Sequence, residues 1–387
     1  MIPIDFNTTT RILCEPNSLS TKLGKVVKDF GATQVLIVTD KALLQLGFVN
    51  LAIEALSAEG IQAIVFDGVI PDPTVEVVDN ALNLARHHHC DAIVALGGGS
   101  SIDTAKIIAL HDNPFISATN LFNQDLSKFN KLPLIAIPTT AGTGAEVTFV
   151  SVITATDGNK FAVFHSKILP DVAILDANLT LGLPPLITAA TALDAMVHCI
   201  EAYTSRTKKN PISDALAVKG LQLLWQNYRK VMTNGKNIEA RSEMLLGSCL
   251  AGMAFVNASV AAVHGLSYPL SIRFHVPHGH ANALVMAGVF TFNLPAAQQH
   301  YAELARAVLP KQTLSLDDTA AATLFIDELK QFLTESGLKT SLRELGIQQT
   351  DIDGLATLMI NTYARLIVSN PIDMTVDDVK KIYQDVF

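Results

Sequence analysis

The chain has 387 residues and a formal net charge of -8, and only 17% of its residues are charged while 49% are hydrophobic. This length predicts two domains rather than one. Lysines and arginines are few and scattered, which excludes a basic footprint for nucleic acid and a patch for anionic membranes, and the low charge content favours burial between subunits of a homo-oligomer.

The N-terminal segment 1–11 reads MIPIDFNTTTR and has no basic stretch followed by an apolar core. We therefore expect no signal peptide. The four cysteines stand far apart and form no CxxC pair, so we expect reduced thiols. Together these features predict a cytoplasmic protein.

The first half of the chain alternates short apolar runs with helical patterns. Strands are expected at 33–40, 61–69, 91–96 and 132–138, and helices at 44–59 and 75–89. Strands separated by helices of this length predict a parallel sheet with crossover helices. Ligands in such sheets bind beyond the carboxyl ends of the strands.

The second half is almost wholly helical. The change follows LGLPPLITAAT at 181–191. We place the boundary near Leu183, which gives an α/β domain at 1–183 and an all-helical domain at 184–387. The predicted fold is therefore α/β followed by all-α.

One stretch, 245–272, contains no Asp, Glu, Lys or Arg and is long enough to span a membrane. It also contains Asn257, His264, Pro269 and three glycines, and no basic flank marks an inner end. A deeply buried helix followed by a turn fits this composition better, so we expect no membrane span.

Two glycine-containing loops follow predicted strands. The first lies in DAIVALGGGSSIDTAKIIAL at 91–110, where three glycines precede Ser100 and a helix. Glycine lets the backbone approach a ligand, and the N-terminus of the helix offers N–H groups that suit phosphate. The loop is neither a G-x-G-x-x-G fingerprint nor a Walker loop, and tight strand–helix packing is the alternative explanation.

The second loop lies in IPTTAGTGAEVT at 137–148, where hydroxyl side chains alternate with glycines. Two such loops in one α/β domain predict a nucleotide site.

Asp40 ends the first clear strand and has two open interpretations. It can accept hydrogen bonds from ribose hydroxyls and repel a 2′-phosphate, or it can cap the helix that follows.

Asp194 and His198 stand four residues apart in the apolar segment TALDAMVHCIEAY at 191–203. This spacing places both side chains on one face of a helix. A buried carboxylate needs compensation. Either the two residues pair at a helix-packing seam, or both bind a metal.

A histidine cluster supplies further candidate ligands. VHGLSYPLSIRFHVPHGHANAL at 263–284 contains His264, His275, His278 and His280. With Asp194 and His198 it offers more than the four protein ligands of a typical divalent site. The tract RHHHC at 86–90 instead closes a helix, where histidines satisfy carbonyls at the negative dipole end.

These motifs, in this order, resemble the iron-dependent (group III) alcohol dehydrogenases, which include lactaldehyde reductase and propanediol dehydrogenases. The resemblance covers nearly the whole chain and is carried by VLIVTD, PDPT, LGGGSSIDTAK, PTTAGTGAEVT, ALDAMVHCIEAY, VHGLSYPL and PHGHANA. It implies a Rossmann-like domain and a helical domain of the dehydroquinate synthase-like fold, with a nicotinamide and a divalent metal in the cleft between them. The implied activity is NAD-dependent interconversion of a small primary or secondary alcohol, or a diol, and its carbonyl compound.

The resemblance also implies site residues. Four residues correspond to the metal ligands: Asp194, His198, His264 and His278. Iron is implied by the family, whereas on ligand grounds Fe²⁺ and Zn²⁺ suit this set equally. Cofactor-binding positions correspond to Asp40, Asp72, Gly97, Gly98, Gly99, Ser100, Thr139, Thr140, Thr143 and Lys160. Asp rather than Gly at position 40 resembles the branch that prefers NAD to NADP.

Two departures concern proton transfer. Tyr268 stands where many members have a histidine, and His280 stands where many have an apolar residue. Both are candidate catalytic residues in the proton relay, besides ribose hydroxyls and water. Because a similar SYP sequence occurs in hydroxyacid–oxoacid transhydrogenases, a hydroxy acid is an alternative substrate. A dehydroquinate synthase-like lyase is a further alternative, although Arg273 alone would serve its substrate phosphate.

Overall fold

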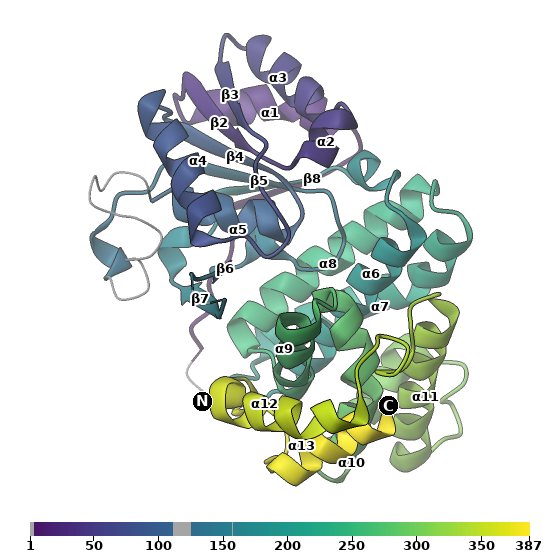
Figure 1. The fold of residues 1–387 in the computed structure, drawn as a ribbon. Coiled ribbons are helices and arrows are strands. Elements are labelled where there is room, and N and C mark those ends of the chain that lie inside the picture. Colours follow the sequence, from purple (N-terminus) through teal and green to yellow (C-terminus); the bar gives the residue numbers. More distant parts are fainter. Residues whose placement is uncertain (1–3, 111–124, 157) are drawn as a thin grey trace. The chain divides into compact units, whose positions relative to one another are not determined.

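The computed structural model describes residues 4–110, 125–156 and 158–387 (Figure 1), so part of the segment examined for a signal peptide lies outside it. The chain divides into two compact units, one at 7–182 and one at 183–387, and residues 4–6 belong with the second. Each unit is described by itself below.

The first unit is built on a parallel sheet, which is six-stranded within the described residues. The strands, in spatial order, are β1 (Arg11–Cys14), β8 (Val172–Leu175), β5 (Leu134–Pro138), β4 (Ala92–Gly97), β2 (Gln34–Val38) and β3 (Gln62–Phe66). The central strands β4 and β5 are buried along their whole length, which is the reason for their uninterrupted apolar sequences. The predicted parallel sheet is confirmed.

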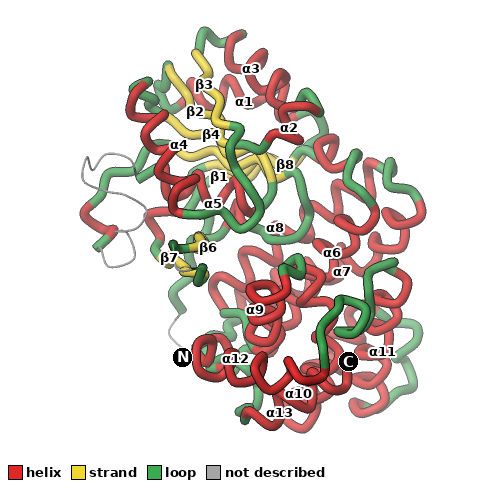
Figure 2. Tube along the Cα trace, in the orientation of Figure 1, coloured by secondary structure: helices red, strands yellow, loops and turns green. Residues whose placement is uncertain are grey.

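Helices cover both faces of this sheet (Figure 2). Alternate strand residues belong to the cores on the two faces. Leu36 and Val38 of β2 belong to the core beneath α4 (Val75–His87) and α5 (Gly99–Ile108). Val35 and Ile37 belong to the core beneath α1 (Ser18–Asp29) and α3 (Phe48–Ser57). This alternation follows from the two-residue repeat of a strand.

The structure differs from the sequence expectation in two places. The helix expected at 44–59 is two helices, α2 (Lys41–Gln45) and α3, because Gly47 has φ 81° and breaks the helical path. The antiparallel hairpin of β6 (Val150–Thr154) and β7 (Lys160–Phe164) was not expected, and neither were β1 and β8. β1, β6 and β7 contain half-exposed or exposed residues and β8 has only four residues, so none of them shows the long apolar run of a strand such as β4.

The second unit is helical, as predicted. Its helices are α6 (Pro185–Thr204), α7 (Pro211–Thr233), α8 (Ile238–Ala258), α9 (Ala262–Phe274), α10 (His278–Val308), α11 (Asp318–Glu335), α12 (Ile352–Ile367) and α13 (Val376–Asp385). The helix α6 packs against α7, α8 and α10, so it is buried on nearly every side. A helix buried in this way shows an apolar sequence all round rather than one apolar stripe.

The uncharged run 245–272 forms the end of α8 and most of α9, and both are largely buried within this unit. Within the described residues, no single helix has the length and apolarity to cross a membrane, and α8 and α9 meet that criterion only as a pair bent by 104°. The break between them lies at 259–261, where Ser259 has φ 80°. The run is therefore two helices rather than one helix and a turn.

Candidate metal centre and cofactor loops

The helix α6 carries the first two predicted metal ligands. It starts at Pro185, a position where proline is preorganised for a helix and loses no hydrogen bond. Asp194 and His198 lie one turn apart on one face and are 2% and 4% exposed. Their burial makes their partners decisive, since a buried carboxylate without compensation is costly.

The other two predicted ligands come from α9 and from the first residue of α10. His264 Nε2 lies 3.0 Å from His198 Nε2. Asp194 Oδ1 lies 4.0 Å from His264 Nε2 and 3.8 Å from His278 Nε2. Ligand atoms of Asp194, His198 and His264 all lie within 4.8 Å of one another. Three helices thus bring together four candidate ligands from two segments of the chain that are more than sixty residues apart in sequence.

Glu201 orients His264 and was not singled out from the sequence. Its Oε2 lies 2.6 Å from His264 Nδ1, and the carboxylate is 1% exposed. Because a carboxylate only accepts, the imidazole donates from Nδ1 and keeps its lone pair on Nε2. That lone pair is the one that faces Asp194 and His198. A carboxylate behind a histidine in this way fixes the ring and raises its basicity as a ligand.

The same carboxylate holds the start of α9. Glu201 also accepts hydrogen bonds from the backbone N–H groups of Ala261 at 2.8 Å and Val263 at 2.7 Å. Ala261 precedes α9 and has no side chain to cap it, so Glu201 serves that purpose from another helix. The signal was present in the sequence: Asp194, His198 and Glu201 recur at the spacing of one helical face.

Asn282 is a second residue that the sequence reasoning missed. It is fully buried on α10, one turn after His278. Its Nδ2 donates to Asp194 Oδ1 at 2.6 Å and lies 3.1 Å from His278 Nε2 and 3.3 Å from His264 Nε2. Ligating carboxylates are commonly held by such an outer hydrogen bond. The four-residue spacing from His278 would have indicated it.

The electrostatics of this cluster suit a divalent cation. Burial alone lowers the pKa of His264, but the charges of Glu201 and Asp194 outweigh it and raise the pKa above its ordinary value. Two carboxylates buried beside imidazole lone pairs are costly without a positive charge among them. One carboxylate oxygen and three imidazole nitrogens are also a usual ligand set for Fe or Zn. The residues present therefore fit the divalent metal that the family resemblance implies.

Aromatic rings pack against the ligand imidazoles. Phe255 stacks on His198 with ring centroids 4.2 Å apart and an interplanar angle of 17°. Tyr268 is predicted to take part in proton transfer. Its ring centroid lies 5.7 Å from that of His278, and its ring stacks on Tyr363 with centroids 5.3 Å apart. The side chain of His278 is 31% exposed, whereas those of Asp194 and His264 are at most 5% exposed. Access to the cluster is therefore on the side of His278 and Tyr268.

His280, the other predicted proton-transfer residue, has a structural partner. Its Nε2 lies 2.7 Å from the backbone oxygen of Lys339, and the residue is 7% exposed. Two positions after His278 on α10, it points to a different face of the helix. Its catalytic role stays a prediction.

The predicted cofactor loops follow neighbouring strands of the first unit. Asp40 comes after β2, Gly97 ends β4 and Thr139 comes after β5, and β4 lies between the other two. The chain passes from β2 to β3, toward one edge of the sheet, and from β4 to β5, toward the other edge. The gap between β2 and β4 is therefore the switch point, the place where sheets of this kind bind ligands.

Close contacts explain the glycines of the first loop. A Cβ on Gly97 would lie 2.4 Å from Ser101 Oγ, and one on Gly99 would lie 2.9 Å from Thr143 Cγ2. The two loops thus touch each other, and the backbone of Thr139 donates to Gly97 O at 3.0 Å. Gly98, Gly99 and Ser100 begin α5 and stay half exposed, which leaves the N-terminus of that helix accessible.

Asp40 is a helix cap in this structure. Its Oδ1 accepts from the backbone N–H groups of Ala42 at 2.9 Å and Leu43 at 3.1 Å. Ribose binding by Asp40 stays a prediction beside this observed role. Asp72 and Lys160, two other predicted cofactor residues, form an ion pair of 2.6 Å. Asp72 has φ 52°, so a tight turn presents it to the lysine.

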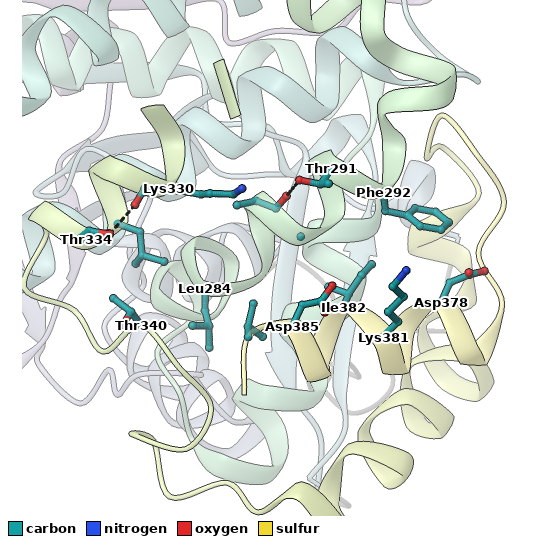
Figure 3. Close-up of a pocket in the computed structure, with 14 residues that line it drawn as sticks. Leu284, Thr291, Phe292, Lys330, Thr334, Thr340, Asp378, Lys381, Ile382 and Asp385 are labelled. Atoms are coloured by element: carbon teal, nitrogen blue, oxygen red, sulfur yellow. Dashed lines mark hydrogen bonds between the residues drawn. The ribbon is translucent and has the colours of Figure 1, made fainter. Parts of the chain in front are cut away.

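A cavity of about 530 Å³ lies elsewhere in the helical unit (Figure 3). It is bounded by α10, α11 and α13 and includes Lys330, Lys381, Asp378 and Asp385 in its lining. None of the predicted ligands lines it. The part of α10 that contributes to it includes Leu284, Gly288 and Thr291, which face away from His278 and Asn282. Its size does not mark it as the reactive site.

Comparison with known proteins defines the class of this enzyme. The family model described as iron-containing alcohol dehydrogenase matches residues 9–177, and the model for the C-terminal part of the Fe-containing alcohol dehydrogenase family matches residues 188–387. The chain belongs to the iron-containing alcohol dehydrogenase family and is an oxidoreductase. The resemblance and the class of activity predicted from the motifs are confirmed.

Relatives in this family share about a third of their residues with the chain. The 1,3-propanediol dehydrogenase of Citrobacter freundii is 36% identical over 96% of both chains. The lactaldehyde reductase of Escherichia coli (strain K12) is 35% identical over 92% of this chain and 93% of its own. Among solved structures, the sulfoacetaldehyde reductase of Bifidobacterium kashiwanohense in complex with NAD+ has a TM-score of 0.88 and 29% identity, covering 100% of this chain and 99% of its own.

Proposed function

We propose that this protein is an NAD- and iron-dependent alcohol dehydrogenase that interconverts a small uncharged alcohol or diol and its aldehyde or ketone. The observation that carries the proposal is the convergence of Asp194, His198 and His264 within 4.8 Å in a buried part of the helical unit. A helix seam held only by hydrogen bonds needs neither three such groups nor a second carboxylate behind them.

In this proposal Asp194, His198, His264 and His278 hold the metal. A divalent ion bound there supplies a Lewis acid that favours the alkoxide of an alcohol and polarises a carbonyl. Glu201 keeps the Nε2 lone pair of His264 directed at the site, and the Asn282 amide holds the ligating oxygen of Asp194. These contacts set the ligand geometry before any ion binds.

The cofactor proposed for the first unit is NAD. The N-terminus of α5, behind Gly98, Gly99 and Ser100, offers N–H groups to a pyrophosphate. Thr139, Thr140 and Thr143 lie on the adjoining loop, and the Asp72–Lys160 pair is available to ribose hydroxyls or phosphate oxygens. The carboxylate of Asp40 disfavours a 2′-phosphate, which supports NAD over NADP. Nicotinamide supplies the hydride chemistry.

The substrate class follows from the rings beside the ligands. Phe255 and Tyr268 line the imidazoles with apolar surface, which favours an uncharged alcohol over a hydroxy acid. The Tyr268 hydroxyl is the proposed proton carrier on the exposed side. We also propose a cytoplasmic homo-oligomer, supported by cysteines that form no disulfide bond in the described residues and by the low charge content.

The test combines metal analysis with turnover. We expect one equivalent of bound iron per chain and NADH formation with short alcohols or diols but not with 2- or 4-hydroxy acids. His264→Ala should lose both metal and turnover. His87→Ala, in an exposed histidine tract at the end of α4, is the matched control and should lose neither. Parent-like metal content and activity in His264→Ala would refute the proposal.

A further inference from the structure

The β6–β7 hairpin lies outside the main sheet and needs an anchor. Within the described residues it is a two-stranded sheet with no ladder to the six-stranded one. A hairpin of this size is marginally stable alone. Yet it follows the second cofactor loop directly, and its strand β7 starts with Lys160, the partner of Asp72.

The anchor is a buried ion pair on α5. Lys106 is fully buried, and its ammonium has three acceptors: Val150 O at 2.6 Å, Thr148 Oγ1 at 2.9 Å and Asp103 Oδ1 at 3.3 Å. An ammonium has three protons, so each finds a partner. Two of these partners belong to the end of the second loop and the start of β6.

Asp103 completes the attachment. Its Oδ2 accepts from the backbone N–H of Val152 at 3.0 Å, and its backbone oxygen accepts from Ser151 Oγ at 2.9 Å. One turn of α5 thus binds consecutive residues of β6. Burial lowers the pKa of Lys106 and raises that of Asp103, and each is partly restored by the charge of the other. Each charge therefore favours the ionised form of the other.

This attachment links the two cofactor loops to each other. The second loop starts at Thr139, bonded to Gly97 O, and ends at Thr148 and Val150, bonded to Lys106. Both of its ends are therefore tied to the segment that contains the first loop and α5. The other end of β6 contacts the turn that contains Asp72, because the backbone N–H of Thr154 donates to Pro73 O at 2.8 Å.

We propose that Asp103 and Lys106 are positioning residues for the cofactor: they clamp the β6–β7 hairpin to α5 and so set the distance between the glycine turn, the threonine loop and the Asp72–Lys160 pair. This inference rests on the cofactor site proposed above. Both side chains are engaged by protein partners, so the proposed role is exerted through the loops that they hold. Without the clamp the hairpin and the second loop exchange between several positions, and only the fraction in the clamped position binds NADH at full affinity.

The test is the affinity of the metal-loaded enzyme for NADH, measured by fluorescence. We expect Lys106→Met to raise the Kd by about tenfold. This value applies if about one tenth of the variant molecules hold the hairpin in the clamped position, because the apparent affinity falls in proportion to that fraction. Thr148→Val removes one acceptor without changing shape and should raise the Kd less, by about threefold. It keeps the test informative if Lys106→Met folds poorly. Metal affinity should stay at the parent value in both.

The matched control is Lys131→Met. Lys131 is also largely buried in the first unit, with a carboxylate partner, Asp171, at 2.7 Å and a backbone oxygen at 2.6 Å. It ties no cofactor loop, so its replacement should leave the Kd unchanged. A rise equal to that of Lys106→Met would mean general destabilisation and would overturn the clamp.

Gly99→Val separates this inference from the proposed site. The new side chain would collide with Thr143, so it should block NADH binding if the glycine turn is the site. Weakened binding in Gly99→Val with parent-like binding in Lys106→Met and Thr148→Val would overturn the clamp alone. Parent-like binding in all three variants would overturn the cofactor site as well.

Discussion

Replacing Glu201 with glutamine tests how much of the metal site depends on a residue that is not a ligand. The carboxylate accepts hydrogen bonds from His264 Nδ1 and from the backbone N–H groups of Ala261 and Val263. Glutamine keeps the shape but has one accepting oxygen instead of two. Placed toward His264 and Ala261, that oxygen leaves the amide NH₂ facing the N–H of Val263.

The expected loss has two parts. His264 loses a charged partner behind its ring, and such outer contacts are worth about 10- to 100-fold in metal affinity, or about 1.4–2.8 kcal/mol. Separately, two donors that face each other leave the N–H of Val263 unsatisfied, which costs about 1–3 kcal/mol of stability. The first loss appears in metal binding and the second in unfolding, so they are measured independently.

Metal affinity is measured by competition with a chelator, and stability by urea unfolding of the metal-free protein. Glu243→Gln on α8 is the matched control, since Glu243 is exposed and accepts a hydrogen bond from Asn227 rather than from a metal ligand. We expect parent-like metal affinity there. Parent-like metal affinity in Glu201→Gln would show that His264 needs no carboxylate behind it and would refute this account of the site.

Three further changes test separate parts of the argument. Asp40→Gly removes a helix cap, which costs only a few tenths of a kcal/mol of stability. It should raise the affinity for NADP relative to NAD about tenfold. An unchanged ratio of the two affinities would show that Asp40 is a cap only. Tyr268→Phe keeps the ring stacked on Tyr363 and should slow turnover about 100-fold with the metal still bound, whereas an unchanged rate would remove the hydroxyl from proton transfer. Burial raises the pKa of Glu146 from 4.5 to about 7. The folded protein therefore holds this proton more tightly than the unfolded chain, and the stability that the proton contributes is full below the unfolded pKa and is lost as pH rises through about 7. Glu146→Gln cannot titrate, so its stability relative to the parent should rise by up to about 3 kcal/mol between about pH 5 and about pH 8, as measured by urea unfolding. A difference that does not vary with pH would contradict the burial argument.

The sequence alone predicted the four inner and edge strands β2, β3, β4 and β5, and the family resemblance of its motifs implied the four candidate ligands. Strands such as β4 and β5 are buried on both faces, so their sequences are uninterrupted apolar runs that need no structure to recognise. The glycines after β4 were visible for a related reason, because contacts such as that of Gly99 with Thr143 admit no side chain. Asp194 and His198 stood out because charge is rare in so apolar a helix.

Only the tertiary structure decided which polar residues serve which purpose. Glu201 and Asn282 stand at helical spacings from the candidate ligands, but their partners, 60 and 88 positions away, are known only from the structure. Lys106 looks like an ordinary helical residue until its partner, 44 positions away, is known. His280 seemed close to the ligands by sequence, but helical geometry turns it to Lys339. Local sequence patterns indicate whether a segment is buried and which backbone conformation it adopts, because both depend mainly on the residues of that segment. Hydrogen bonds between distant segments depend on how helices and strands pack, and no single segment carries that information.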